Sequence, residues 1–430
     1  MGNFIAQKNG HRNLLLLMRS LYSIGISFYT ILIRIAAYAN TKAGKLIKGR
    51  KGWKKELTKI PSDKKVFWFH SASLGEFEQG RPLIEKIKNK HPEIFILLTF
   101  YSPSGYEIRK NYKNADLIMY LPPDTKKNAC YFIKHAHPTL AVFIKYEFWY
   151  NFIFYAKKEG VKLYSIATLF RNGQIFFKPW GKWFRKHLQY FEHFYAQNEQ
   201  TALIAEKHDL KKITIAGDTR FDRVAEIASQ NEEIDLVKEF AANHFTVIAG
   251  SSWPAEHNLL AKLCNHGPDD IKYIIAPHEL NEKQYELLEK NIEAKVTRLS
   301  QVSETQVKHA RVLIIDSIGL LSRLYRYGNV ALIGGGFGKG IHNVLEPAVY
   351  GLPVIFGPEY KKFHEAVTMV AQKIAFPINN YQQLETIIGK LYHNKEYLRE
   401  KSTQTRLFVE HQLGATDLIL QEIEKQIVNQ

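Results

Sequence analysis

The apolar positions of this chain fall into short runs that alternate with amphipathic stretches from about Lys65 onward. Short apolar runs bounded by turn residues are typical of buried strands, and strand–helix alternation favours parallel sheets covered on both faces. The first set of predicted strands covers 66–69, 94–99, 117–120, 140–144, 162–166 and 213–216. The second set covers 245–249, 273–276, 312–315, 330–333 and 354–356.

A polar, acidic stretch at 227–238 separates the two sets of strands. A chain of 430 residues is long enough for two domains and an appendage. We therefore predict an α/β fold with two Rossmann-like domains, at 46–230 and 231–430, facing a cleft. Ligands of open α/β sheets bind at the carboxyl ends of the strands, so the chemistry is expected just after each strand.

The richest segment is 330–358, which reads as a strand, a glycine loop (334–340), a capped helix from about Asn343 and a strand at 353–356. Glycines let a backbone approach a ligand closely, and the start of a helix favours a phosphate. The spacing fits neither G-x-G-x-x-G nor a P-loop. An ordinary corner with Asn343 and Glu346 as a capping box is the alternative. Because the loop holds more glycines than a corner needs, we favour a nucleotide-type ligand.

Near the N-terminus, Leu14–Met18 and Leu21–Ile33 form two apolar stretches separated by Arg19 and flanked by Lys and Arg. The longest uncharged part has about 14 residues, fewer than the roughly 20 of a spanning helix. A basic segment follows, which argues against a cleaved signal peptide. Three alternatives stay open: an interfacial amphipathic anchor, a single span with snorkelling arginines, or an apolar helix packed on the body. We favour membrane attachment and assign residues 1–45 to an anchor.

The formal charge of +17 points to an anionic partner. A nucleic-acid-binding protein is disfavoured because much of the basic excess lies beside the apolar segment and no nucleic-acid-binding motif is present. The basic flank suits an anionic membrane surface. Cys130 and Cys264 are the only cysteines, so we expect no disulfide framework and a reducing compartment.

Three charged residues follow strands in the first half of the chain. Glu76 comes after the first strand at a helix start, where a carboxylate could act as a general base or merely complement the helix dipole. Glu147 lies among aromatic residues, which favours partial desolvation, although a surface charge at a helix start would look the same. Arg220 could clamp a phosphate or carboxylate, or pair with a neighbouring Asp.

In the second half, strand ends are followed by Ser251 and Ser252, by Pro277 and His278, and by 316–319. Hydroxyls and a histidine suit recognition of a phosphate and a base, and the alternative for any one loop is a helix cap. His257 and His342 lie in separate loops and read as polar contacts. No cluster has metal-ligand spacing. We also expect no cofactor.

Taken in order, these loops resemble those of the 3-deoxy-D-manno-octulosonic acid (Kdo) transferases of Gram-negative bacteria, from about residue 67 to 364. The matching motifs are H-S-A-S-L-G-E at 70–76, Y-E-F-W at 146–149, G-D-T-R-F-D at 217–222, G-S-S-W-P-A-E at 250–256 and H-N-V-L-E-P-A at 342–348. The resemblance implies a two-domain GT-B glycosyltransferase that moves Kdo from CMP-Kdo onto a lipid A precursor, with inversion and without a metal. It also implies the cytoplasmic face of the inner membrane, reached through the N-terminal segment.

Carried over by motif, Glu76 would be the proton-accepting base, and Glu147 and Arg220 would assist at the transition state. The first domain would bind the acceptor and the second the CMP-sugar. The expected CMP-binding residues, which include the two serines after the strand at 245–249, are Ser251, Ser252, Pro277, His278, Ile318, Gly319, Leu320, Asn343, Val344, Leu345 and Glu346.

The chain departs from the family pattern at three points. No arginine stands between Pro277 and His278, Leu320 replaces a glutamate, and Arg220 replaces a lysine. The alternative function is another GT-B glycosyltransferase, one that uses a UDP-sugar and a lipid acceptor.

Overall fold

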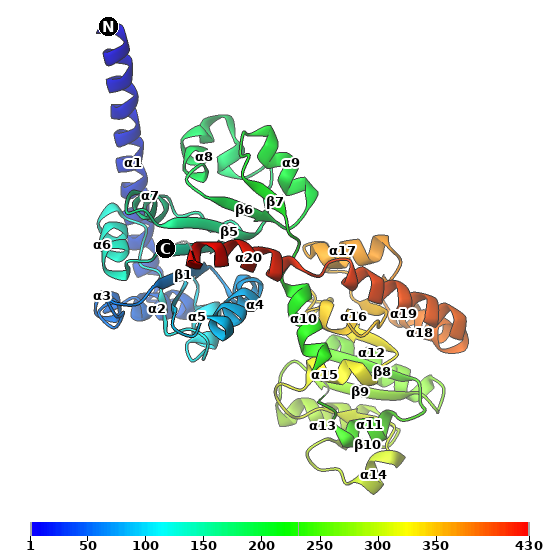
Figure 1. Cartoon of the computed structure of the whole chain (residues 1–430). Helices are drawn as coiled ribbons and strands as arrows, with labels where there is room; N and C mark the ends of the chain where they lie inside the picture. Colours follow the sequence, from blue (N-terminus) through cyan, green and yellow to red (C-terminus); the bar gives the residue numbers. More distant parts are fainter. Residues whose placement is uncertain (1, 231, 429–430) are drawn as a thin grey trace. The chain divides into compact units, whose positions relative to one another are not determined.

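The computed structural model describes residues 2–230 and 232–428, and the chain divides into two compact units (Figure 1). Unit 1 contains Met1–Arg220 and Gly414–Gln430, and unit 2 contains Phe221–Leu413. The division thus falls ten residues before the predicted boundary at 230, and the last helix of the chain belongs to unit 1.

Unit 1 is built on one sheet with the strand order β3-β2-β1-β4-β5-β6-β7, in which every neighbouring pair is parallel. Its strands are β1 (Val66–Ser71), β2 (Phe95–Phe100), β3 (Leu117–Tyr120), β4 (Leu140–Ile144), β5 (Lys162–Thr168), β6 (His193–Ala196) and β7 (Ile213–Ile215). Its helices are α1 (Gly2–Ala36), α2 (Thr41–Gly49), α3 (Trp53–Leu57), α4 (Leu74–Lys90), α5 (Pro103–Arg109), α6 (Lys126–Ala136), α7 (Tyr150–Lys158), α8 (Lys182–Leu188), α9 (Glu199–Lys207) and α20 (Ala415–Val428), with 3₁₀ turns at Ile175–Phe177 and Pro179–Gly181.

Alternate residues of β1 enter two different cores, because side chains of a strand point to opposite faces. Val66 and Trp68 pack with residues of α3, α6 and α7, whereas Phe67 and Phe69 pack with residues of α4 and α20. The helix α20 is tied to α4 by apolar burial and by the ion pair of Lys86 with Asp417, at 2.6 Å. The end of the chain therefore completes one face of the first sheet.

Unit 2 repeats the plan with the order β10-β11-β9-β8-β12-β13-β14, again all parallel. Its strands are β8 (Thr246–Ser252), β9 (Lys272–Pro277), β10 (Val296–Arg298), β11 (Val312–Ile314), β12 (Val330–Ile333), β13 (Val354–Phe356) and β14 (Ala375–Pro377). Its helices are α10 (Arg220–Ser229), which starts on the last residue of unit 1, α11 (Asp235–Ala241), α12 (Pro254–His266), α13 (Glu282–Asn291), α14 (Glu304–His309), α15 (Leu321–Leu324), α16 (Leu345–Ala348), α17 (His364–Ala371), α18 (Tyr381–His393) and α19 (Lys395–Glu410), with a 3₁₀ turn at Tyr325–Tyr327.

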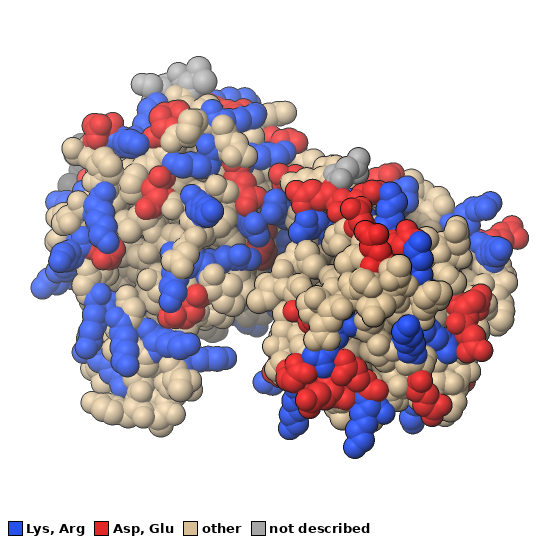
Figure 2. All heavy atoms as spheres, turned by 90° about the horizontal axis from the view of Figure 1, so that it is seen from below, with Lys and Arg blue, Asp and Glu red and all other residues tan. Residues whose placement is uncertain are grey.

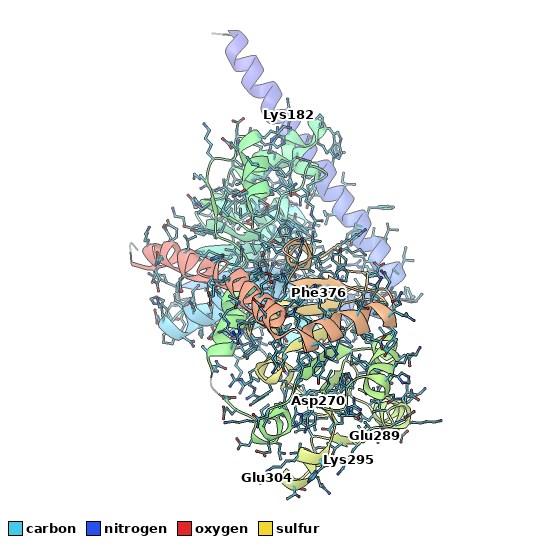
Figure 3. The ribbon with its side chains drawn as sticks, turned by 90° about the vertical axis from the view of Figure 1, so that its right-hand side faces the viewer. Lys182, Asp270, Glu289, Lys295, Glu304 and Phe376 are labelled. Atoms are coloured by element: carbon cyan, nitrogen blue, oxygen red, sulfur yellow. The ribbon has the colours of Figure 1, made fainter. Side chains whose placement is uncertain are left out.

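Each predicted strand corresponds to a strand of the structure, and the α/β class with two parallel sheets is confirmed. Three short strands escaped prediction, namely β6, β10 and β14. β10 and β14 are edge strands with the sequences V-T-R and A-F-P, in which polar residues or a proline interrupt the apolar run. At the β10 edge Arg298 donates to Glu289 at 2.6 and 2.9 Å. Figure 3 labels Glu289 and Lys295, which also belong to this part of unit 2. Such charges protect an exposed edge.

The predicted helix from Asn343 is shorter than expected. It is α16, which begins at Leu345 and has four residues. Asn343 does cap it, since its Oδ1 accepts from the amide of Leu345 at 3.0 Å. Asn343 Nδ2 also donates to Glu346 Oε1 at 3.0 Å, so the two residues of the expected capping box do interact, but side chain to side chain.

The N-terminal helix α1 packs on unit 1 through its second half. Tyr22 donates a hydrogen bond to Asp124 at 2.7 Å, and Asp124 in turn accepts from the amides of Asn151 and Phe152 at the start of α7. Arg19 lies over the ring of Phe154. Among the helices that the structure describes, none is long and apolar enough to cross a membrane, so the spanning alternative for the N-terminal anchor is not supported.

The charge of the chain is concentrated in unit 1. That unit carries 38 Lys and Arg against 19 Asp and Glu, whereas unit 2 carries 21 against 23. Figure 2 shows one face, on which Lys and Arg gather on the body at the left and both signs mix on the body at the right. The anionic partner predicted from composition is therefore expected at unit 1.

The glycine loop after β12 owes much of its composition to packing. A Cβ on Gly334 would overlap the main chain of Ser251, and a Cβ on Gly336 would overlap the main chain of Gly357. The buried Glu256 holds the same loop, because its Oε1 accepts from the amide of Gly335 at 3.0 Å. These glycines are thus explained by close approach of neighbouring backbone, without a ligand.

We expect Gly336→Ala to lower the free energy of unfolding by roughly 1–3 kcal/mol, the usual cost of overpacking where main chain cannot yield. Gly338→Ala is the matched control, since the nearest atom to its added Cβ lies 3.8 Å away. Denaturant unfolding of both variants measures the effect. Equal stability of the two variants would contradict this account of the loop.

Candidate functional site

The carboxyl end of β1 leads into the loop that positions Glu76. Glu76 stands in the first turn of α4, and its side chain is 6% exposed. Its Oε2 accepts a hydrogen bond from the amide of Ala72 at 2.5 Å. Burial raises the pKa of Glu76, while the amides of Ala72 and Ser73 and the charge of Lys145 act in the opposite direction. Such a carboxylate is a stronger base than an exposed one.

The loop after β4 brings Glu147 near Glu76. Burial, and then the charge of Glu76, raise the pKa of Glu147 to about 8. Glu147 lines a pocket of about 510 Å³ together with Ala72 and side chains that are mostly aromatic, among them Tyr101, Tyr146 and Trp149. The pair therefore holds a proton near neutral pH, and an aromatic wall beside it suits the apolar face of a sugar.

A hydrogen-bond chain fixes the loop that carries Glu147. Trp149 Nε1 donates to His70 Nε2 at 3.0 Å, and His70 Nδ1 lies 2.9 Å from Thr99 Oγ1. Trp68 Nε1 donates to the same hydroxyl at 2.8 Å. Since Nε2 accepts, His70 is assigned as the neutral Nδ1–H tautomer, and burial lowers its pKa to about 3. His70 and Thr99 thus position the site without carrying charge.

Arg220 is paired with Asp218. Its Nη2 and Nε donate to Asp218 Oδ2 at 2.7 and 3.0 Å. Burial acts to raise the pKa of Asp218, but Arg220 and the hydrogen bonds outweigh it and the pKa is lowered. Gln79, one turn after Glu76 on α4, also donates to Asp218 at 3.2 Å. The structure therefore shows the Asp-paired alternative for Arg220, held next to the helix that carries Glu76.

In unit 2, the loops after β8, β11 and β12 meet at a pocket of about 330 Å³. Four of the predicted CMP-binding residues line it, namely Ser251, Gly319, Asn343 and Glu346. Its other lining residues are Leu321, Ser322, Tyr325 and His342. Polar and aromatic groups from separate loops converge here, as expected at the carboxyl ends of parallel strands.

Other predicted CMP-binding residues lie elsewhere. Val344 and Leu345 are buried in the core, and Ser252 is buried with its Oγ 2.9 Å from His257 Nε2. Pro277 is buried at the end of β9, Leu320 packs against the core, and Ile318 is 89% exposed. In this structure these side chains do not line the pocket, so any contact from them has to be made through main chain or at the rim.

Three rings stack beside this pocket. His278 lies between Trp253 and His342, with centroid distances of 4.5 Å to each, and Trp253 Nε1 donates to His342 Nε2 at 3.0 Å. Burial lowers the pKa of His342 to about 4. The sequence analysis had named His342 only as a polar contact and missed Tyr325, whose hydroxyl packs so close to Gly250 that a Cβ there would overlap it. The glycine before Ser251 was the available signal.

Residues at the ends of β4 and β8 have left-handed backbone, as has Ala167 in β5. Lys145 follows β4 with φ 70°, and Ser251 in β8 has φ 51°. Neither residue is glycine, and such conformations cost energy that a fold retains mainly near functional sites. One of them thus stands at each of the two pockets described above.

Comparison with known proteins finds similarity to the family that the sequence motifs resemble. The family described as 3-deoxy-D-manno-octulosonic-acid transferase (kdotransferase) matches residues 47–223. The chain is 25% identical over 352 residues to the 3-deoxy-D-manno-octulosonic acid transferase of Aquifex aeolicus, covering 80% of this chain and 91% of that protein. It is 27% identical over 325 residues to that of Chlamydophila psittaci, covering 72% of each.

Solved structures of similar fold include UDP-GlcNAc 2-epimerase from Neisseria meningitidis, with a TM-score of 0.56, 14% identity, and coverage of 84% of this chain and 100% of that one. MurG of Acinetobacter baumannii has a TM-score of 0.53, 12% identity, and coverage of 84% and 99%. These likenesses support the GT-B-like fold. The resemblance to Kdo transferases is confirmed by the relatives, and the chain is an enzyme of the glycosyltransferase class.

We expect the side chain of Glu147 to titrate near pH 8. The titration is measured by NMR on protein with ¹³C-labelled glutamate, and the resonance of Glu147 is identified by its loss in Glu147→Gln. Glu76→Gln should lower this pKa, because it removes a neighbouring negative charge. Glu159→Gln, at an exposed position of the same unit, should leave it unchanged.

The sign for stability follows from the raised pKa. A carboxyl that binds its proton more tightly in the folded state stabilises the fold below its unfolded pKa, and this contribution is lost as the pH rises through about 8. Glu147→Gln should remove this decline between about pH 5 and 8 in denaturant unfolding. A decline of the same size in the variant would contradict the assignment.

Proposed function

We propose that this enzyme transfers Kdo from CMP-Kdo to a hydroxyl of a lipid A precursor, with inversion and with Glu76 as the general base. The observation that carries the proposal is a pair of interacting carboxylates in unit 1: the buried Glu76, and the half-buried Glu147 that lines the aromatic pocket. The named relatives support the donor sugar, and the family resemblance supports the acceptor.

In the proposed reaction Glu76 takes the proton of the acceptor hydroxyl. The hydroxyl oxygen attacks the anomeric carbon of Kdo, and the bond from that carbon to CMP breaks so that CMP departs. The raised pKa of Glu76 strengthens it as a base. Glu147, which holds a proton near neutral pH, can donate a hydrogen bond to the reacting sugars. The division of roles follows from environments that separate the two pKa values, as in other carboxylate pairs.

Unit 2 would hold the nucleotide in the pocket lined by Ser251, Asn343 and Glu346. Glu346 can accept from ribose hydroxyls, and the hydroxyls of Ser251 and Ser322 can donate to phosphate oxygens. No Lys or Arg lines this pocket among the described residues, which agrees with the absence of an arginine beside His278. Because α16 has four residues, hydroxyl and main-chain donors would carry more of the phosphate recognition than its dipole.

The helix α1 would attach the enzyme to the membrane surface. Ile24, Phe28, Ile31 and Ile35 recur at spacings of three and four, lie on one face and are 50–64% exposed. Arg34 and the lysines of α2 flank this face. An exposed apolar stripe with basic neighbours is typical of a helix that lies in the interface of an anionic membrane. Attached in this way, the enzyme would meet a lipid acceptor at the cytoplasmic face of the inner membrane, the location that the family resemblance implies.

The donor assay tests the proposal directly. Purified full-length chain is incubated with a lipid A precursor and with CMP-Kdo, CMP-sialic acid or UDP-GlcNAc, and the product is identified by mass spectrometry. We expect transfer from CMP-Kdo alone. Transfer from UDP-GlcNAc would instead support the alternative, a GT-B enzyme that uses a UDP-sugar.

We expect Glu76→Gln to lower kcat at least 10²-fold, the usual range for loss of a general base. KM for CMP-Kdo should change little, because the lost interaction belongs to the transition state. Calorimetric titration with CMP checks that the nucleotide pocket is intact. A kcat equal to that of the wild type would exclude Glu76 as the base and make Glu147 the next candidate.

Replacing Ile24, Phe28 and Ile35 together by Ser should release the protein from liposomes containing phosphatidylglycerol, because the residues are exposed and supply the apolar contact. The matched control replaces Leu407, Leu413 and Leu418, which are 42–43% exposed on unrelated surfaces. Flotation measures both variants. Equal flotation would show that α1 is no interfacial anchor.

A further inference from the structure

A second pocket of unit 1 has no role in the chemistry described so far. It has a volume of about 610 Å³ and is lined by residues of α1, by the α2–α3 segment and by the start of α6. Three of its lining residues are cationic, namely Arg34, Arg50 and Lys51, and none of its lining residues is a carboxylate. The pocket is distinct from the aromatic pocket that contains Glu147, with which it shares no lining residue.

The central group of this pocket is Arg50, which is 8% exposed. Its guanidinium stacks at 4.8 Å over the ring of Tyr101, yet its Nε and Nη2 atoms have no hydrogen-bond partner. A buried cation with unsatisfied donors is costly unless an anion pairs with it. The described groups that interact with its charge are tyrosine side chains and include no acid. Burial accordingly lowers the pKa of Arg50, as expected for a cation without a counter-ion.

The other lining residues complete an anion site. Arg34 and Lys51 are exposed at the pocket, where their charges can reach a group seated on Arg50. A guanidinium fork suits the oxygens of a phosphate, and a lysine adds a point charge. Ile31 and Trp53 supply apolar wall to the same pocket, which suits a phosphate attached to a larger, partly apolar molecule.

We propose that the pocket lined by Arg34, Arg50 and Lys51 binds the phosphate group of a lipid. The phosphate could be carried by the acceptor or by the headgroup of an anionic phospholipid, and both sources present the same monoester or diester oxygens. The first source rests on the proposed function, whereas the phosphate site itself does not.

The first experiment measures the site with inorganic phosphate. Titration of the full-length chain should show stabilisation against heat that saturates with phosphate. The double variant Arg34→Gln/Lys51→Gln, altered at exposed positions, should weaken the apparent affinity about tenfold or more, as for loss of hydrogen bonds to charged groups. The control Lys207→Gln/Lys211→Gln removes two exposed charges of unit 1 that neither line the pocket nor belong to α1 or α2, and it should change the affinity little.

Arg50→Gln is informative in a different way. Because Arg50 is buried without a partner for two of its donors, the variant should be at least as stable as the wild type without phosphate and should lose the stabilisation by phosphate. If Arg50→Gln does not fold, the double variant Arg34→Gln/Lys51→Gln, compared with its control, still tests the proposal. Equal phosphate affinity of the pocket variant and its control would overturn the proposal.

The second experiment distinguishes the two sources. One arm compares KM for a phosphorylated lipid A precursor and for its dephosphorylated form. A preference for the phosphorylated form that is lost in Arg34→Gln/Lys51→Gln but kept in the control supports the acceptor phosphate. The other arm uses vesicles of phosphatidylcholine with and without phosphatidylglycerol, and weaker binding of the pocket variant alone supports the headgroup. No difference between variant and control in either arm would overturn a lipid phosphate as the ligand. CMP binding is measured for every variant and should be unchanged. Intact CMP binding in a variant without a phosphate effect shows that the phosphate site has failed and not the nucleotide site of the proposed function.

Discussion

The parallel direction of every strand is the constraint on which the rest of the structure depends. Because all strands of a unit run the same way, the loops that follow them open at one edge of the sheet. Residues far apart in sequence, such as Glu76 and Glu147, therefore meet, as do Ser251 and Glu346 in the other unit. Helices on both faces bury the strands, and only the loops remain to be shaped for chemistry.

The burial that makes these loops useful also has a cost. Two carboxylates near one another and partly removed from water destabilise each other as charges, and the protein answers by raising their pKa values. The surrounding support is neutral: His70 is uncharged, and Trp149 and Thr99 are joined to it through hydrogen bonds. A positive charge on His70 would favour the ionised form of Glu147, so the neutrality of the hydrogen-bonded groups from Trp68 to Trp149 helps to keep the pKa of Glu147 raised.

Much of the fold could be predicted from the sequence because apolar runs report burial directly. Strands such as 117–120 and 330–333 were placed to the residue, whereas β10 and β14 were missed because polar residues or a proline interrupt their apolar runs. The candidate site was predicted less completely. Ser251 was found because it follows a predicted strand, and Glu346 was carried over from the family motif. Tyr325 lies in a 3₁₀ turn and reaches the pocket only through the fold. Val344 and Leu345 share a motif with pocket residues, yet their side chains serve the core. A linear motif does not separate the two uses.

The glycine loop shows that a glycine-rich motif can have a packing origin even where it lies beside a pocket. Its glycines suggested close approach of a ligand. However, a side chain at Gly334 or Gly336 would overlap neighbouring main chain, and Glu256 accepts a hydrogen bond from the amide of Gly335. The packing in turn sets the position of His342 and Asn343, which do reach the pocket. The loop would therefore contribute to binding of the proposed nucleotide through the side chains of His342 and Asn343, which it holds in place. Since unit 2 carries almost no net charge, the nucleotide recognition that we propose there would depend on such placed hydroxyls, amides and rings. The excess cations of unit 1 suit the anionic, lipid-borne partner that we propose for that unit.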